Sequence, residues 1–206
     1  MTQVTIIDGA TPGEIAAWVH ARLAAALAAS GAPVAIAVPG GSTPFPIFEA
    51  LAALPLEWGR ITVWPTDDRV VPEGHPASNA GRIRALLAPA GAEVVALSEM
   101  EQVPRFALAW LGMGADGHIA SLFPSTDPRA DEPQAIRRLM PDPLPPEAPF
   151  ERITLTMPAL LASDALLFVI PGPDKRAVFA AAARGEGDTP VARLLAAARQ
   201  PVTCFA

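Results

Sequence analysis

Short apolar segments alternate along this chain with longer segments in which apolar residues recur at helical spacing. A short apolar run bounded by turn residues indicates a buried strand, and apolar positions three and four residues apart indicate one face of a helix. The predicted strands span residues 34–38, 61–64, 93–97, 106–111, 153–156 and 166–170. The predicted helices span residues 12–30, 44–53, 78–88, 157–163, 173–184 and 190–199.

This alternation predicts an α/β fold in which a mostly parallel sheet is covered by helices on both faces. Five prolines within residues 141–149 exclude a helix interior or a central strand there. Because the alternation resumes at Arg152, we interpret this stretch as a rigid excursion within a single domain spanning residues 1–206. Ligands of such sheets bind beyond the carboxyl ends of the strands, so the loops after residues 38, 64, 111 and 170 form the candidate site.

The loop after residue 111 contains one carboxylate, Asp116, and one of the chain's three histidines, His118, among three glycines. Glycine permits positive φ and close approach of the backbone, and histidine changes charge near neutral pH. The loop is therefore a candidate functional site that presents a titratable ring. The alternative is an ordinary turn in which Asp116 caps a following helix and His118 is merely exposed.

The loop after residue 38 has the composition of an anion site at a helix N-terminus. Gly40 and Gly41 leave backbone N–H groups free to point at an anion. Ser42 follows them, and Thr43 is placed as N-cap with Pro44 as the first helical residue. This pattern outlines a phosphate cradle, although an ordinary capped turn shares it. It matches neither the Walker motif nor the dinucleotide fingerprint, so no nucleotide is predicted.

Two further segments supply charged groups at the same edge of the sheet. After residue 64, adjacent Asp67 and Asp68 project in different directions, so we expect one carboxylate to face the cleft and the other to brace Arg69. A surface salt bridge is the alternative. After residue 170, Lys175 lies in the first turn of a predicted helix, where the helix dipole disfavours a cation unless an anion is bound. Arg152 is a further candidate donor.

Composition restricts the class of partner. A net charge of −6 and the absence of tyrosine argue against nucleic acid, but a small anionic ligand needs only a local cluster of donors. The single cysteine, Cys204, excludes an internal disulfide and fits a reducing compartment. Without a signal-peptide pattern or a long apolar stretch, we expect a cytoplasmic protein with no membrane partner. His20, His75 and His118 lack ligand spacing, so no metal site is predicted.

Five motifs in this order resemble those of the 6-phosphogluconolactonase family: GGSTP at 40–44, DDRVVP at 67–72 with SN at 78–79, GMGADGHIASLFP at 112–124, RITLT at 152–156 and GPDK at 172–175. The resemblance implies a three-layer αβα sandwich like that of glucosamine-6-phosphate deaminase. It also implies hydrolysis of 6-phosphoglucono-δ-lactone to 6-phosphogluconate in the pentose phosphate pathway, without metal or organic cofactor. The expected partner is this sugar-phosphate lactone, and the expected state is a monomer or weak homodimer.

By this resemblance, His118 matches the general base and Asp67 matches the carboxylate that faces the sugar. Arg69 matches the arginine of the same acidic loop. The positions around the phosphate are matched by Gly41, Ser42, Arg152 and Lys175. The chain departs from the family at two places: Asp68 stands where glutamate is usual, and the stretch 88–105 is shorter than is typical.

The implied chemistry suits these residues. A δ-lactone is an activated ester, so a positioned base that takes a proton from water suffices and contributes roughly 10²–10⁴-fold. The phosphate cradle would hold the ring in register with that base. We expect the backbone N–H groups of residues 114–117 to stabilise the developing oxyanion. Asp116 is the candidate that orients His118.

Three other functions compete. A deaminase related by this resemblance carries a glutamate five residues after the histidine, where this chain has Phe123. A serine hydrolase would use Ser121, within reach of His118 if both lie on a helix, but the Gly-x-Ser-x-Gly elbow is missing. A non-catalytic sugar-phosphate sensor would keep the cradle without needing His118.

Overall fold

The larger sheet of the molecule is parallel throughout. A computed structural model describes residues 3–144 and 148–206. The strands of this sheet are β1 (Val4–Ile7), β2 (Val34–Val38), β3 (Ile61–Pro65), β5 (Glu93–Val94), β6 (Leu108–Leu111), β9 (Leu166–Val169) and β10 (Val202–Phe205). Within the described residues these seven strands pair in the order β1-β10-β9-β6-β2-β3-β5. Each parallel neighbour requires a crossover connection, which brings helices onto the faces of the sheet.

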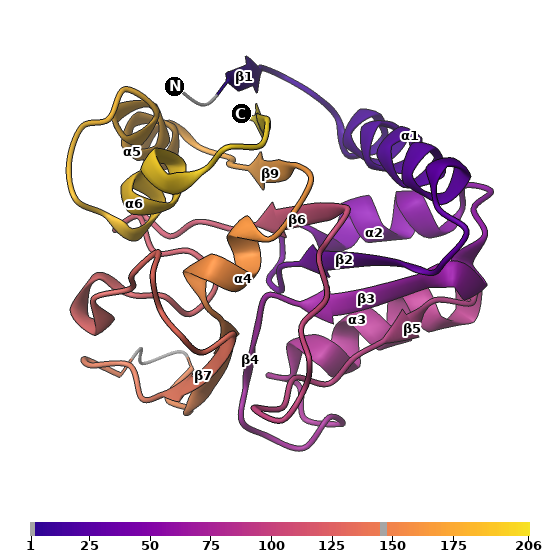
Figure 1. Cartoon of the computed structure of the whole chain (residues 1–206), viewed down its shortest axis with the longest axis horizontal. Coiled ribbons are helices and arrows are strands. Elements are labelled where there is room, and N and C mark those ends of the chain that lie inside the picture. Colours follow the sequence, from indigo (N-terminus) through magenta and orange to yellow (C-terminus); the bar gives the residue numbers. More distant parts are fainter. Residues whose placement is uncertain (1–2, 145–147) are drawn as a thin grey trace.

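The helices cover both faces of this sheet. They are α1 (Pro12–Ala29), α2 (Phe45–Ala52), α3 (Asn79–Leu87), α4 (Met157–Leu161), α5 (Pro173–Ala183) and α6 (Pro190–Ala197). In β2, Ile36 packs with α1, α2 and α3, whereas its neighbours Ala35 and Ala37 pack in the core that contains α4, α5 and α6. Figure 1 shows these two groups of helices on opposite sides of the strands. Successive strand residues point to opposite faces, so the predicted three-layer αβα architecture is confirmed.

A smaller antiparallel sheet extends the second face. It consists of β4 (Asp67–Arg69), β8 (Arg152–Leu155) and β7 (Ile136–Leu139), with β8 in the middle. Ile153 and Leu155 enter the same core as Ala37 of the central sheet. The strand predicted over residues 153–156 is thus present as β8, but it is antiparallel to its neighbours and lies outside the larger sheet. A short apolar run fits either a central parallel strand or one buried within a small antiparallel sheet.

Several boundaries also differ from the sequence prediction. The edge strand β1 was not predicted, because its middle residues Thr5 and Ile6 are exposed. The strand expected over 93–97 is regular only at Glu93–Val94, and α4 ends before residue 163. The short 3-10 helices are Trp58–Arg60, Ala88–Ala90 and Pro124–Thr126.

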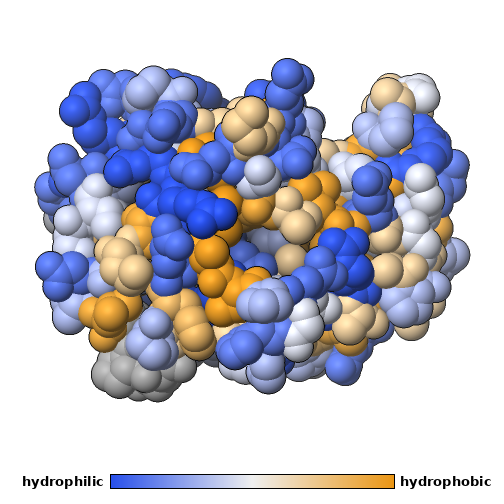
Figure 2. Space-filling view, turned by 90° about the horizontal axis from the view of Figure 1, so that it is seen from below, coloured by the Kyte–Doolittle hydropathy of each residue, from blue (hydrophilic) through white to orange (hydrophobic). Residues whose placement is uncertain are grey.

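The proline-rich excursion is described only in part, because residues 145–147 lie outside the described residues; residues 141–144 contain neither helix nor strand. Among the described helices, none has the length and apolarity needed to span a bilayer. Seen from below, the surface mixes hydrophilic and hydrophobic residues and is hollowed near its centre (Figure 2).

Candidate active site

A cleft of about 310 Å³ opens where the loops after β2, β3, β6 and β9 meet. These are the four loops expected to converge at the carboxyl edge of the sheet. Eight of the predicted site residues line the cleft, namely Gly40, Gly41, Ser42, Thr43, Asp67, Arg69, His118 and Lys175. Asp116 and Arg152 do not line it. The loop arrangement predicted from strand order therefore brings most of the candidate residues together.

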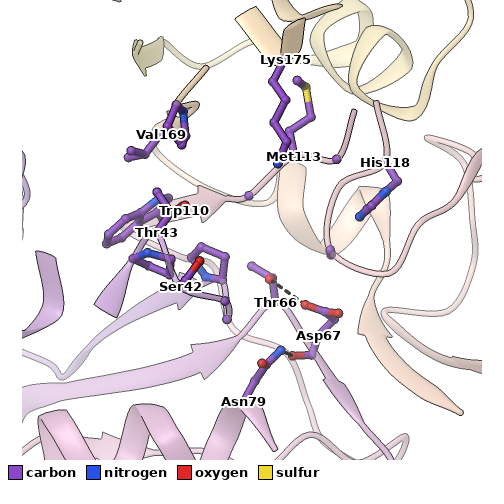
Figure 3. Close-up of a pocket in the computed structure, with 18 of the residues that line it drawn as sticks. Ser42, Thr43, Thr66, Asp67, Asn79, Trp110, Met113, His118, Val169 and Lys175 are labelled. Carbon is purple, nitrogen blue, oxygen red and sulfur yellow. Dashed lines mark hydrogen bonds between the residues drawn. The ribbon is translucent and has the colours of Figure 1, made fainter. Parts of the chain in front are cut away.

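The cleft has two chemically different ends. Figure 3 shows Ser42 and Thr43 on one side and Asp67 and His118 on the other, with Lys175 extending into the space from α5. The glycine-rich loop at one end and the Lys175 amine that enters the cleft are groups that suit an anion. The other end carries a carboxylate and an imidazole, which suit proton transfer and hydroxyl recognition.

The glycine-rich loop leaves its backbone donors unused. Gly41 has a φ of 97°, a conformation that glycine adopts without strain. In the described part of the chain, the N–H groups of Gly40, Gly41, Ser42 and Thr43 have no protein acceptor. The expected capping role of Thr43 is wrong, because α2 begins at Phe45 with Pro44 at the N-cap position and no side chain caps it. The loop therefore presents free N–H groups to the cleft.

Gly40 lies against Asn79, and a Cβ atom added at Gly40 would overlap the Asn79 side chain. Asn79 is buried; its amide nitrogen donates to the Asp67 carbonyl at 2.8 Å, and its oxygen accepts from Arg69 at 3.1 Å. Gly40→Ala is expected to raise KM for a phosphorylated ligand several-fold and to destabilise the fold by about 1–3 kcal/mol through overpacking. Steady-state kinetics and urea unfolding measure both effects.

Gly31→Ala is the matched control, because its added Cβ meets nothing within 4 Å. We expect this variant to keep the wild-type KM. An unchanged KM in Gly40→Ala as well would contradict the tight contact between the loop and Asn79.

Asp68 is buried and binds backbone N–H groups at the start of α3. Its oxygens accept from the backbone N–H groups of Asn79 at 2.6 Å, Ala80 at 2.9 Å and Arg69 at 2.8 Å. The Arg69 guanidinium instead donates to the Ala77 carbonyl and to Asn79, both at 3.1 Å. The prediction that the second carboxylate braces the guanidinium is therefore wrong, whereas Asp67 does face the cleft as expected.

Asp116 holds the ring of His118. The Asp116 Oδ1 atom lies 2.6 Å from His118 Nδ1 and accepts the His118 backbone N–H at 3.1 Å. Partial burial raises the pKa of Asp116, but the His118 N–H and the nearby imidazole outweigh it, so the net pKa is lowered. An ionised carboxylate only accepts hydrogen bonds, so Nδ1 carries the proton and Nε2 is left free. No helix follows directly, so Asp116 is not a helix cap.

Backbone hydrogen bonds within the loop that carries His118 join its two ends. The Gly114 N–H donates to the His118 carbonyl at 2.9 Å, and the Gly117 N–H donates to the Gly114 carbonyl at 3.1 Å. The expectation that residues 114–117 supply oxyanion donors therefore fails for both glycines. The ring of Phe123 lies beside the imidazole, with centroids 4.9 Å apart. The serine-hydrolase alternative needs Ser121 on a helix with His118, but Ser121 lies in a turn. It also does not line the cleft.

The two predicted cations differ in their surroundings. Lys175 lies in the first turn of α5 and, within residues 3–144 and 148–206, forms no ion pair. Arg152 is only 4% exposed; one guanidinium nitrogen donates to the Ala148 carbonyl at 2.9 Å. Burial lowers the pKa of Arg152, and the charge of Arg69, its partner in the β4–β8 ladder, lowers it further. Arg152 thus lies behind the cleft wall, beside Arg69.

Thr66, Asn79, Trp110 and Met113 also line the cleft, and the sequence reasoning gave them no role there. Asn79 had a signal in the SN motif, but helix capping was a sufficient explanation for it. Trp110 and Met113 are large, mostly apolar and buried, so nothing in their chemistry distinguished them from core residues.

Comparisons with known proteins place the chain in a family. The family model described as glucosamine-6-phosphate isomerases/6-phosphogluconolactonase matches residues 10–98 and 89–203. A Pseudomonas aeruginosa protein named 6-phosphogluconolactonase is 38% identical over 93% of this chain and 84% of its own length. A relative of the same name from Mesorhizobium japonicum is 34% identical over 93% and 88%. The chain belongs to the glucosamine-6-phosphate isomerase/6-phosphogluconolactonase family.

Solved structures agree with this placement. The crystal structure of a 6-phosphogluconolactonase from Shewanella baltica has a TM-score of 0.82 and 27% identity, covering 100% of this chain and 97% of that one. A putative 6-phosphogluconolactonase from Neisseria gonorrhoeae has a TM-score of 0.82 and 29% identity, covering 100% and 98%. The fold expected from the resemblance is thereby confirmed.

Proposed function

We propose that this chain hydrolyses 6-phosphoglucono-δ-lactone to 6-phosphogluconate, with His118 as the general base that activates water. The observation that carries the proposal is one cleft holding both a donor-rich anion end and a carboxylate-oriented imidazole. The names of the relatives point to the same substrate.

The substrate would bind with its phosphate at the N–H groups of residues 40–43 and the Lys175 amine, near Arg69. Charged hydrogen bonds of this kind are stronger than neutral ones and fix the orientation of the sugar. The lactone carbonyl would then lie at the opposite end, beside His118 and Asp67. Holding the two ends in register converts binding energy into positioning of the ester.

In the chemical step, His118 Nε2 takes a proton from water as the water oxygen attacks the lactone carbonyl carbon. The bond between that carbon and the ring oxygen then breaks, and the imidazolium returns the proton to the leaving ring oxygen. The Asp116 carboxylate, 2.6 Å from Nδ1, stabilises the imidazolium that forms. The site requires no covalent enzyme intermediate, because the δ-lactone is already activated.

The position of Phe123 argues against the deaminase alternative. Its side chain packs on the His118 ring, where the resemblance places a glutamate in deaminases. An apolar ring neither accepts nor relays a proton. The test is to supply the purified chain with fresh 6-phosphoglucono-δ-lactone and, separately, with glucosamine 6-phosphate. Hydrolysis of the lactone without ammonia release is expected; ammonia release without lactonase activity would reverse the assignment.

Asp116→Asn is expected to lower kcat by about tenfold or more, because an amide can hold the His118 ring in the wrong tautomer. This loss is expected to be smaller than that caused by removing the base itself. Substrate binding is expected to change little, since Asp116 does not line the cleft. Rates measured across pH 5–9 test this. Asp131→Asn, an exposed carboxylate paired with Arg129, is the control. Equal kcat in the two variants would remove Asp116 from the mechanism.

We further propose a cytoplasmic location and a monomer or weak homodimer as the working state. The single cysteine, Cys204, is free and buried, which fits a reducing compartment. Every group used above comes from one chain, so the reaction needs no residue from a second copy.

A further inference from the structure

Ser121 lies just outside the cleft, behind the end that carries Asp67 and His118. It follows His118 by three residues, its side chain is buried with 1% of the residue exposed, and it is not part of the cleft lining. Its hydroxyl donates to Asp67 Oδ2 at 2.5 Å. Asp67 does line the cleft, so this hydroxyl reaches the substrate only through that carboxylate.

The backbone holds Ser121 in place. Its N–H donates to the Thr154 hydroxyl of β8 at 3.2 Å, and Thr154 is fully buried. The next N–H, from Leu122, donates to the Ile119 carbonyl at 2.8 Å and closes a tight turn. A side chain fixed at its backbone in this way loses little further freedom when its hydroxyl binds a carboxylate, which strengthens its effect on orientation.

Asp67 has few other restraints. Its second oxygen, Oδ1, accepts from the Thr66 hydroxyl at 3.4 Å, a long contact. Across the described ranges the Asp67 carboxylate forms no ion pair of 4.0 Å or less, and the Ser121 hydroxyl provides its one short hydrogen bond. With Oδ2 engaged by Ser121, Oδ1 is the atom left to accept a hydrogen bond from the sugar.

The geometry excludes Ser121 as a nucleophile. A nucleophilic serine needs its oxygen exposed to the substrate and a base beside it. Ser121 is buried, and His118 Nδ1 is taken by Asp116 rather than by the serine. The hydroxyl instead connects the loop that carries His118 to the strand end that carries Asp67.

We infer that Ser121 is a positioning residue of the lactonase reaction: it fixes the Asp67 carboxylate so that its other oxygen, Oδ1, faces the bound sugar hydroxyls. This inference rests on the proposed function. Ser121 thereby couples the placement of Asp67 to that of His118, and loss of its hydroxyl affects turnover only through Asp67.

The test is a double-mutant cycle of Ser121→Ala and Asp67→Ala, with kcat and KM measured on 6-phosphoglucono-δ-lactone. Ser121→Ala is expected to lower kcat/KM about tenfold in the wild-type background and by less than about twofold in the Asp67→Ala background. Ser121→Cys, with a similar volume and a weaker donor, is expected to be intermediate and serves if the alanine variant fails to fold.

Ser163→Ala is the matched control. Ser163 is equally buried, and its hydroxyl donates to the Leu160 carbonyl at 2.9 Å. This variant shares any loss of stability but is expected to keep wild-type kcat/KM.

Three outcomes would overturn the inference. The first is wild-type kinetics in Ser121→Ala and Ser121→Cys. The second is an equal loss with and without Asp67. The third is complete loss of turnover together with labelling of Ser121 by a fluorophosphonate, which would make it a nucleophile. Lack of turnover in both the wild type and Ser163→Ala is a separate result, which would overturn the proposed function and this inference with it.

Discussion

Replacing His118 by alanine is expected to lower kcat for 6-phosphoglucono-δ-lactone by roughly 10²–10⁴-fold, the usual contribution of a positioned base. The ring is the imidazole that lines the cleft, and Asp116 holds it with Nε2 free. Affinity for 6-phosphogluconate is expected to change by less than about threefold, because the groups proposed to hold the phosphate lie at the other end. Single-turnover hydrolysis and product-binding calorimetry separate the two effects.

His20→Ala is the control for this experiment. His20 lies on α1, with its Nε2 atom 2.9 Å from the Pro55 carbonyl, and is not part of the cleft. It is expected to turn over like the wild type. A His118→Ala variant with near-normal kcat would remove His118 as the base, whatever happens to binding.

Replacing Asp68 by alanine is expected to reduce the free energy of unfolding by about 3 kcal/mol or more, since several buried donors lose a charged acceptor. The carboxylate accepts three backbone N–H groups and, at 3.2 Å, the Ser78 hydroxyl. Its loss also frees the start of α3 and with it Asn79, so KM is expected to rise. Urea unfolding and steady-state kinetics measure the two changes.

Asp68→Asn is the graded comparison, because one amide oxygen can accept some of these bonds while the amide nitrogen accepts none. Its stability is expected to fall between those of the wild type and Asp68→Ala. If Asp68→Ala unfolds at the wild-type urea concentration, the carboxylate does not stabilise the start of α3.

The central sheet was predictable where strands are buried on both faces. Residues 34–38 and 166–170 form continuous apolar runs, and the structure contains β2 and β9 there. Edge and polar strands were not predictable in this way. β1 has an exposed middle, β4 consists of Asp67–Arg69, and β7 includes two arginines, so none of them shows a strand-like apolar pattern.

The candidate site was likewise predictable in part: the meeting of its loops was predictable, and the contacts of its side chains were not. That four loops meet at one edge is a consequence of strand direction, which the alternation of elements already implied. The hydrogen-bond partners of individual side chains are not implied by that alternation, because they depend on tertiary distances. Adjacent Asp67 and Asp68 have the same chemistry in the sequence, yet one binds the Ser121 hydroxyl at the cleft and the other caps α3. Both lie on β4, where successive side chains point to opposite faces and so meet different partners.

One comparison tests most directly whether the anion end of the cleft places the ester beside His118. It is the ratio of kcat/KM for 6-phosphoglucono-δ-lactone to that for glucono-δ-lactone, each freshly made and corrected for spontaneous hydrolysis. Two or more charged hydrogen bonds to the phosphate predict a preference of about 100-fold or more for the phosphorylated lactone. Equal values for the two lactones would contradict the proposed phosphate site and the mechanism built on it.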